Sequence, residues 1–65
     1  MEIQLNGRVI NSSATDLMEL VTEQGLDPGC VVVEHNRGVI KQDAWEKTPL
    51  CNGDIVELLS FVGGG

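Results

Sequence analysis

The dipeptide Asn6-Gly7 stands between residues 2–5, which alternate polar and apolar, and the apolar pair Val9-Ile10. Both central residues of a type I′ turn need a positive φ, which Asn and Gly tolerate better than other residues. An Asn-Gly pair between two such segments is therefore a strong local signal for a β-hairpin. We predict that residues 2–10 form two antiparallel strands joined by this turn.

Residues 13–26 have the pattern of a short amphipathic helix. Three apolar residues fall at i, i+3 and i+4 on one helix face: Leu17, Leu20 and Val21. We prefer Thr15 as the N-cap, with Asp16 in the first turn, and Ser13 is the alternative N-cap. Gly25 suits the C′ position, and Leu26 follows where a Schellman motif makes its hydrophobic contact. Such a short helix needs a sheet to pack on, since isolated short helices are marginal in water.

The second half of the chain predicts three more strands. They are residues 30–34, residues 39–40 and the long apolar run 55–62. We expect tight turns at 35–38 and 51–54, and a turn or one helical turn over 41–47 that Pro49 ends. The resulting order of elements is that of a small α+β domain with one helix across one face of a sheet.

Charged side chains indicate which face of each later strand is buried. An ionised Glu is almost never fully buried without a partner, so Glu34 and Glu57 are expected to face solvent. The alternate residues then face the helix: Val31, Val33, Val56 and Leu58. On the open face we expect an exposed apolar patch of Val32, Leu59 and Phe61 near the end of the last strand, and we expect these three residues and Val62 to dock a partner. An apolar patch on so small a domain is typical of a partner site.

Composition argues against several classes of function. Four Lys and Arg stand against ten Asp and Glu, so the formal net charge is −6, which disfavours nucleic-acid binding. A chain of 65 residues has a small core and little room for a catalytic cleft. No apolar run approaches the roughly 18 residues of a membrane-spanning helix, and the first residues lack a secretory pattern. We therefore expect a cytoplasmic protein that is neither an enzyme nor membrane-bound.

Individual side chains add little chemistry. His35, Cys30 and Cys51 match no zinc spacing, and two cysteines do not make a disulfide framework, so we expect no metal site and reduced thiols. Trp45 is the one tryptophan, and we expect it to cap the small core. The acidic residues on or near the outer helix face are Asp16, Glu19 and Glu23. They either are simply solvated or steer the protein to a basic partner.

The sequence ends in three glycines, residues 63–65, after the last predicted strand. Glycine loses the most entropy on ordering, so we expect residues 1–62 to form the domain and residues 63–65 a flexible tail. Without side chains the tail fits a narrow channel, where it presents an ionised α-carboxylate. Such a carboxylate is a nucleophile toward the α-phosphate of ATP, and adenylation would make its carbon an electrophile. The alternative is a frayed end without function.

These features resemble the ThiS/MoaD family of ubiquitin-like sulfur carriers over the full length of the chain. The residues that carry the resemblance are Ile3-Gln4-Leu5-Asn6-Gly7, Thr15-Asp16-Leu17 with Leu20, Trp45, Asn52-Gly53-Asp54 and Phe61-Val62-Gly63-Gly64-Gly65. The short length, the tryptophan and the three-glycine end are more typical of the thiamine branch than of the longer molybdopterin-synthase subunits. The resemblance implies a β-grasp fold, in which one helix crosses a mixed sheet of about four to five strands.

The resemblance also implies a function. An E1-like, ThiF-type enzyme would adenylate Gly65 with ATP and magnesium, and a sulfur donor such as a cysteine desulfurase would convert it to a thiocarboxylate. A ThiG-type thiazole synthase would take that sulfur into the thiazole of thiamine. Gly63 and Gly64 would enter the partner's active site. The chain itself would bind no cofactor and hold no catalytic residue.

Three alternatives remain open from the residues alone. The first is a sulfur carrier for another product, such as molybdopterin. The second is a ubiquitin-like modifier, in which Gly65 would form an isopeptide bond to a lysine. The third is a β-grasp interaction module whose tail is inert.

Overall fold

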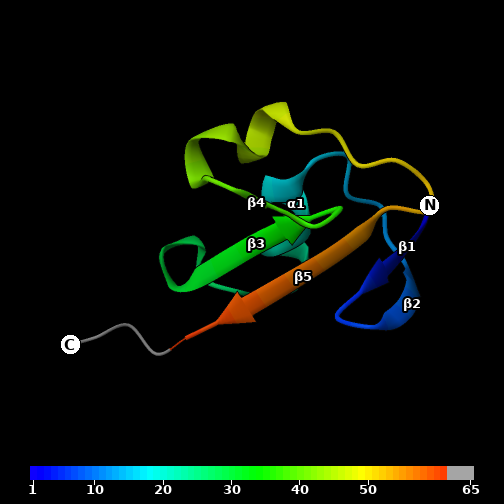
Figure 1. Cartoon of the computed structure of the whole chain (residues 1–65), viewed down its shortest axis with the longest axis horizontal. Coiled ribbons are helices and arrows are strands. Elements are labelled where there is room, and N and C mark those ends of the chain that lie inside the picture. Colours follow the sequence, from blue (N-terminus) through cyan, green and yellow to red (C-terminus); the bar gives the residue numbers. More distant parts are fainter. Residues whose placement is uncertain (62–65) are drawn as a thin grey trace.

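The computed structural model describes residues 1–61, which form a five-stranded sheet with one α-helix packed on one face (Figure 1). In chain order the elements are β1 (Glu2–Leu5), β2 (Arg8–Asn11), α1 (Leu17–Glu23), the 3₁₀-helix η1 (Pro28–Cys30), β3 (Val31–His35), β4 (Gly38–Ile40), the 3₁₀-helix η2 (Gln42–Lys47) and β5 (Ile55–Ser60). The strand order is β2-β1-β5-β3-β4, with β1 and β5 parallel and the other pairs antiparallel. The predicted α+β class, with a mixed sheet and one helix in the β-grasp arrangement, is confirmed.

The opening hairpin has the predicted turn. Asn6 and Gly7 have φ values of 50° and 81°, which are the two positive values that a type I′ turn requires. The strands pair from Glu2 opposite Asn11 to Leu5 opposite Arg8. This register places Ile3 and Leu5 on the face that packs against the helix, where both are buried.

The helix begins one residue later than predicted, because Asp16 is the N-cap. Asp16 has an extended backbone, and its Oδ1 accepts a hydrogen bond from the N–H of Glu19 at 2.8 Å. The carboxylate of Glu19 in turn accepts hydrogen bonds from the N–H and the hydroxyl of Thr15, each at 2.9 Å. The preference for Thr15, with Ser13 as alternative, is therefore wrong. The Asp-x-x-Glu spacing, which resembles a capping box, is the signal for the correct start.

The helix ends in the predicted Schellman motif. Gly25 has a φ of 73°, and its N–H donates to the carbonyl of Thr22 at 2.9 Å. The N–H of Leu26 donates to the carbonyl of Val21 at 3.2 Å, and the Leu26 side chain packs against the core. These are the 5→2 and 6→1 hydrogen bonds that define the motif.

The ends of β3 and β5 differ from the prediction. Cys30 lies in η1 rather than in a strand, because Asp27 caps this 3₁₀-turn with its carboxylate. β5 ends at Ser60, so Phe61 lies outside the strand, although its N–H still donates to the carbonyl of Cys30 at 2.8 Å. Val62, predicted as the last strand residue, lies outside the described residues.

The connection between β3 and β4 is tighter than predicted. Its two central residues, Asn36 and Arg37, have φ values of 49° and 77°, again the signs of a type I′ turn. His35 and Gly38, expected in the turn, pair with each other at the ends of the strands. The polar segment that follows forms η2, in agreement with the expectation of a turn or helical turn.

The core lies between the sheet and the helical layer. The predicted inward residues of β3 and β5 are all buried: Val31, Val33, Val56 and Leu58. The helix contributes Leu17, Leu20 and Val21. Trp45 in η2 is 2% exposed, and its indole N–H donates to the carbonyl of Ile40 at 2.8 Å, so it closes the core as expected. Because α1 and η2 occupy one face, the other face of the sheet is open.

Candidate functional site: the open sheet face and the end of β5

An apolar patch lies on the open face near the end of β5. We define it as Val32, Leu59 and Phe61. Val32 and Leu59 are direct cross-strand neighbours in β3 and β5, and they are 41% and 56% exposed. Phe61, two residues further along, is 52% exposed. The prediction that these three side chains are exposed on the open side is confirmed, whereas their role in docking stays a prediction.

The other residues to which the sequence assigned a role lie just beyond this patch in the sequence. Gly65 as the sulfur-carrying residue, Gly63 and Gly64 as the segment that enters a partner, and Val62 as a docking residue all lie outside the described residues. The structure describes the strand that leads to them. β5 pairs with β3 from Val56 opposite His35 to Ser60 opposite Val31.

A polar cluster fixes the opposite end of β5. Nε2 of His35 lies 2.8 Å from Oδ2 of Asp54, and the side chain of Asn36 donates to Oδ1 of Asp54 at 3.2 Å. The N–H of Cys51 also donates to Asp54, at 2.9 Å. Burial alone would raise the pKa of Asp54, but the hydrogen bonds from His35, the Cys51 N–H and Asn36 hold that pKa below its usual value. This cluster joins the β3–β4 turn to the loop before β5, and sequence reasoning assigned no role to it.

The carboxylates of the helix residues Glu19 and Glu23 accept hydrogen bonds from the loop that precedes the helix. Oε1 of Glu23 accepts a hydrogen bond from the hydroxyl of Ser12 at 2.6 Å, and Oε2 accepts from the N–H and hydroxyl of Ser13 at 3.2 and 3.1 Å. The hydrogen bond from Ser12 is the main cause of the lowered pKa of Glu23. The bonds from Thr15 lower the pKa of Glu19 in the same way. Both carboxylates therefore hold the β2–α1 loop, and their predicted steering of a basic partner stays a prediction.

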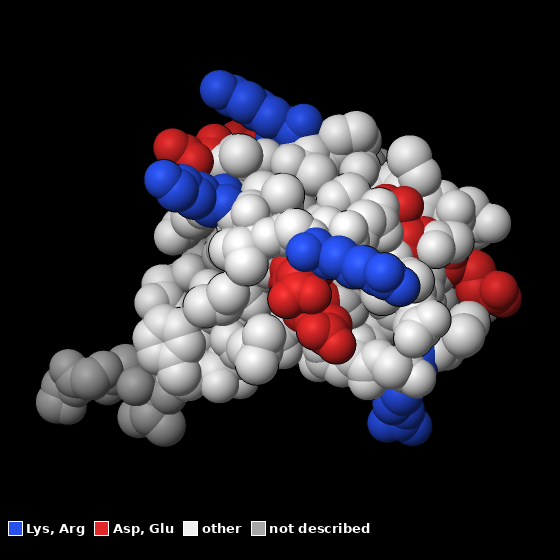
Figure 2. Space-filling view, viewed as in Figure 1, with Lys and Arg blue, Asp and Glu red and all other residues white. Residues whose placement is uncertain are grey.

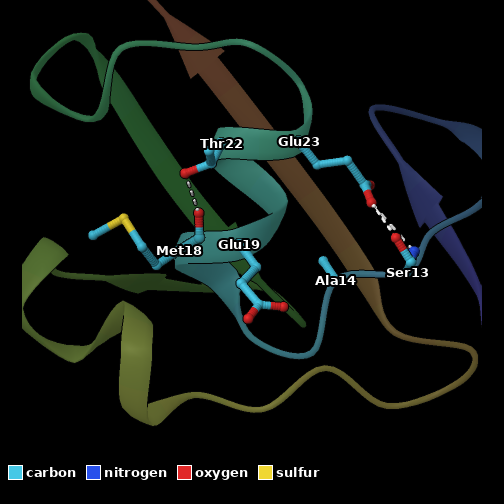
Figure 3. A pocket seen from close by; sticks show the side chains of 6 residues that line it. All are labelled: Ser13, Ala14, Met18, Glu19, Thr22 and Glu23. Atoms are coloured by element: carbon cyan, nitrogen blue, oxygen red, sulfur yellow. Dashed lines mark hydrogen bonds between the residues drawn. The ribbon is translucent and has the colours of Figure 1, made fainter.

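A shallow depression lies between that loop and the outer side of α1 (Figure 3). Its lining residues are Ser13, Ala14, Met18, Glu19, Thr22 and Glu23. The hydroxyl of Thr22 donates to the carbonyl of Met18 at 2.9 Å, and the side chain of Glu23 reaches back to Ser13 (Figure 3). The polar side chains that line the depression are thus already hydrogen-bonded to other groups of the protein. The depression is therefore a weaker candidate site than the open sheet face.

Other possible sites lack the required groups in the part of the chain that is described. Residues 1–61 hold no group of three His, Cys, Asp or Glu side chains placed to bind a metal ion. Both cysteines are free, with Cys51 exposed and Cys30 partly so. Within the same residues, no helix has the length and apolar character needed to cross a membrane.

Comparison with known proteins gives matches over nearly the whole chain. Residues 2–65 match the ThiS family. The sulfur carrier protein ThiS of Bacillus subtilis (strain 168) is 31% identical over 65 residues, which cover 97% of this chain and 98% of that protein. A thiazole synthase of Paramagnetospirillum magneticum is 33% identical over 66 residues, and the match covers 100% of this chain but only 20% of that protein. The crystal structure of the thiamine biosynthesis protein ThiS from Geobacter metallireducens aligns with a TM-score of 0.84 at 30% identity, over 100% of both chains.

The mixed sheet, the single helix across it and the strand that leads into a glycine end define a small ubiquitin-like β-grasp protein. Within that class the family is also established. The chain belongs to the ThiS family, because the match extends over residues 2–65 and a structure of that family has the same fold.

Proposed function

We propose that this protein carries sulfur in the biosynthesis of the thiazole of thiamine, with Gly65 as the residue that holds the sulfur. The observation that supports this most is the family match, which extends over residues 2–65 and so includes the glycine end. A relative of nearly the same length is named a sulfur carrier protein. In this role the chain is a protein co-substrate and not a catalyst.

The carboxylate of Gly65 is the reactive group of the proposed cycle. On an E1-like, ThiF-type enzyme with ATP and magnesium, a carboxylate oxygen attacks the α-phosphorus, pyrophosphate leaves and an acyl adenylate forms. The persulfide of a donor such as a cysteine desulfurase then attacks the acyl carbon, and AMP leaves. A thiol reduces the resulting acyl disulfide, which leaves a thiocarboxylate on Gly65. ATP and reduced thiols are both available in the cytoplasm, where we place these steps.

The proposed acceptor of the sulfur is a ThiG-type thiazole synthase. Two relatives named thiazole synthase match 100% of this chain, and the match spans 20% of each of them. A segment similar to the carrier therefore occurs within proteins that bear the name of the acceptor enzyme. Such an arrangement favours a direct complex between the two activities, since joining them in one chain raises their effective concentration.

The apolar patch is the surface proposed to dock the partner enzymes. It lies at the end of β5, which is the last strand before Gly65. Four residues separate Phe61 from the end of the sequence, and four residues span at most about 14 Å. A partner that binds the patch therefore has the carboxylate of Gly65 within reach of its own active site.

Reconstituted thiazole synthesis tests this function with two variants. Deletion of Gly64 and Gly65 should abolish sulfur transfer, because the terminal carboxylate then stands on Gly63, two residues short of the reacting position in the partner's active site, while Trp45 fluorescence reports an intact fold. Phe61→Asp should leave the fold intact and weaken partner binding. Full activity of the deletion variant would contradict the proposal and favour an inert tail, and unchanged binding by Phe61→Asp would remove the docking role of the patch.

A further inference from the structure

Two glutamates lie directly opposite each other in the middle of the open sheet face. Glu34 in β3 pairs with Glu57 in β5, one step along the same face from the pair Val32 and Leu59. Glu57 is exposed and Glu34 is partly buried. Like charges directly opposite each other on a sheet destabilise it. The arrangement therefore acts against the stability of the free protein.

No ion pair within the described residues compensates this repulsion. Among residues 1–61 the only pair at salt-bridge distance is His35 and Asp54, and neither glutamate takes part in it. Arg37 is the basic residue closest in sequence to Glu34, and it forms no salt bridge with either glutamate. Figure 2 looks onto the open face and shows acidic side chains near its middle with a basic side chain beside them. That basic side chain must be tested as a competing explanation.

Apolar side chains border the two carboxylates. The apolar patch lies on one side, and Val39 in β4, which pairs with Glu34, is 67% exposed. Ile55, two residues before Glu57 in β5, is 43% exposed. A partner that covers this face would remove both carboxylates from water, which costs free energy unless it supplies a cation.

We infer that the Glu34–Glu57 pair receives an arginine side chain of the thiazole synthase when that enzyme covers the apolar patch. This inference rests on the proposed function. A guanidinium presents several donors in one plane, so it can bind two carboxylates at once, and its weak hydration suits an apolar border. A second copy of this chain is disfavoured as occupant, because a symmetric contact would bring four carboxylates together.

The position of Glu57 in the strand that precedes the glycine end in the sequence supports this choice of partner. Glu57, Leu59 and Phe61 alternate along the last strand and its extension toward Gly65. An arginine bound at Glu57 would therefore fix the direction in which β5 approaches the enzyme. Cross-interface charge pairs of this kind set register and exclude wrong partners.

The test measures binding of the full-length carrier to thiazole synthase from the same organism by calorimetry. Glu34→Gln/Glu57→Gln keeps the shape of both side chains and removes two charges. Asp43→Asn/Glu46→Gln is the matched control, since both residues are exposed on η2, away from the open sheet face. The inference predicts at least about tenfold weaker binding for the first variant, a weaker salt dependence, and no more than about a twofold change for the control.

Unfolding of the free variants separates the inference from its competitor. Without an internal counter-ion, Glu34→Gln/Glu57→Gln is at least as stable as the natural protein, as followed by Trp45 fluorescence. If that variant is less stable and Arg37→Gln shows the same loss, Arg37 is the counter-ion and the inference is wrong. Equal binding by the natural protein and the variant would overturn this inference alone. Failure of the natural protein to bind the synthase would overturn the proposed partner as well.

Discussion

The side chain of Asn6 hydrogen-bonds to both backbone groups of Leu58. Oδ1 of Asn6 accepts from the N–H of Leu58 at 2.8 Å, and Nδ2 donates to the carbonyl of Leu58 at 3.3 Å. The backbone pairing of β1 with β5 reaches only to Leu5 opposite Val56. The side chain of Asn6 thus extends the pairing of β1 with β5 beyond the last paired backbone residues. It also connects the first turn of the chain to the strand that leads to Gly65.

Two substitutions separate the roles of Asn6. Asn6→Gly keeps the positive φ and removes the two side-chain hydrogen bonds, so we expect a loss of about 1–2 kcal/mol in the free energy of unfolding. Asn6→Ala keeps a β-carbon at a φ of 50° but lacks the polar side chain that lets asparagine adopt this conformation, which should add roughly 1–2 kcal/mol to the loss seen for Asn6→Gly. Urea unfolding followed by Trp45 fluorescence measures both. Equal stability of Asn6→Gly and the natural protein would show that the bonds to Leu58 contribute nothing.

Gly25 and Gly29 offer a matched pair for the Schellman motif. A β-carbon at Gly25 meets nothing within 4 Å, so Gly25→Ala tests the cost of a φ of 73° without any clash. We expect a loss of roughly 1–2 kcal/mol. At Gly29 the φ is not positive, and the nearest atom to a β-carbon is Oδ1 of Asp27 at 3.5 Å. Gly29→Ala should be neutral or stabilising by less than about 1 kcal/mol, and thermal unfolding that ranks the two variants in reverse order would contradict this account.

Ser12 and Ser13 both bond to Glu23, but only Ser12 is buried. The Oγ of Ser12 also accepts the N–H of Ala14 at 3.1 Å, and that N–H would lose its partner in Ser12→Ala. We expect Ser12→Ala to lower the free energy of unfolding by about 1–3 kcal/mol. Ser13→Ala should lower the free energy of unfolding by less than about 0.5 kcal/mol, because Ser13 is exposed and water can take the place of its hydroxyl at Glu23. Equal losses in denaturant unfolding would refute the difference in burial as the cause.

The polar cluster at Asp54 predicts a dependence of stability on pH. The pKa of Asp54 lies below its usual 3.8, so its stabilising effect is fully present above that value and is lost as the pH falls through the lower folded-state pKa. At neutral pH we expect Asp54→Asn to be less stable by about 1–2 kcal/mol, since hydrogen bonds to a charged acceptor are weakened. Unfolding measured from pH 7 to pH 2 should show this difference shrink below about pH 4. A difference that stays constant down to pH 2 would exclude the proposed ionic contribution.

The alternation of residues along the later strands predicted which of their faces is buried. The expected outward positions of Glu34 and Glu57 correctly placed Val56 and Leu58 in the core and Leu59 on the open face. Asn6-Gly7 predicted the first turn, and Gly25 predicted the end of the helix. In each case the property that decides the structure belongs to the residue itself or to its near neighbours in sequence.

Features that depend on distant partners were not predicted. The bonds of Asn6 join residues 52 positions apart, and nothing in the local pattern reveals them. Likewise, the direct opposition of Glu34 and Glu57 required the register of β3 and β5. The start of the helix is a different case, because its signal, the Asp-x-x-Glu spacing of Asp16 and Glu19, is local in the sequence.

The carboxylate of Gly65 is the centre of the proposed function, and intact mass spectrometry tests it most directly. The carrier is incubated with a ThiF-type enzyme, ATP, magnesium and a sulfur donor whose activity has been verified with a known carrier. The account predicts a mass increase equal to the replacement of one oxygen by sulfur, which fragmentation localises to Gly65. An unchanged mass, with no acyl adenylate detected, would contradict the account.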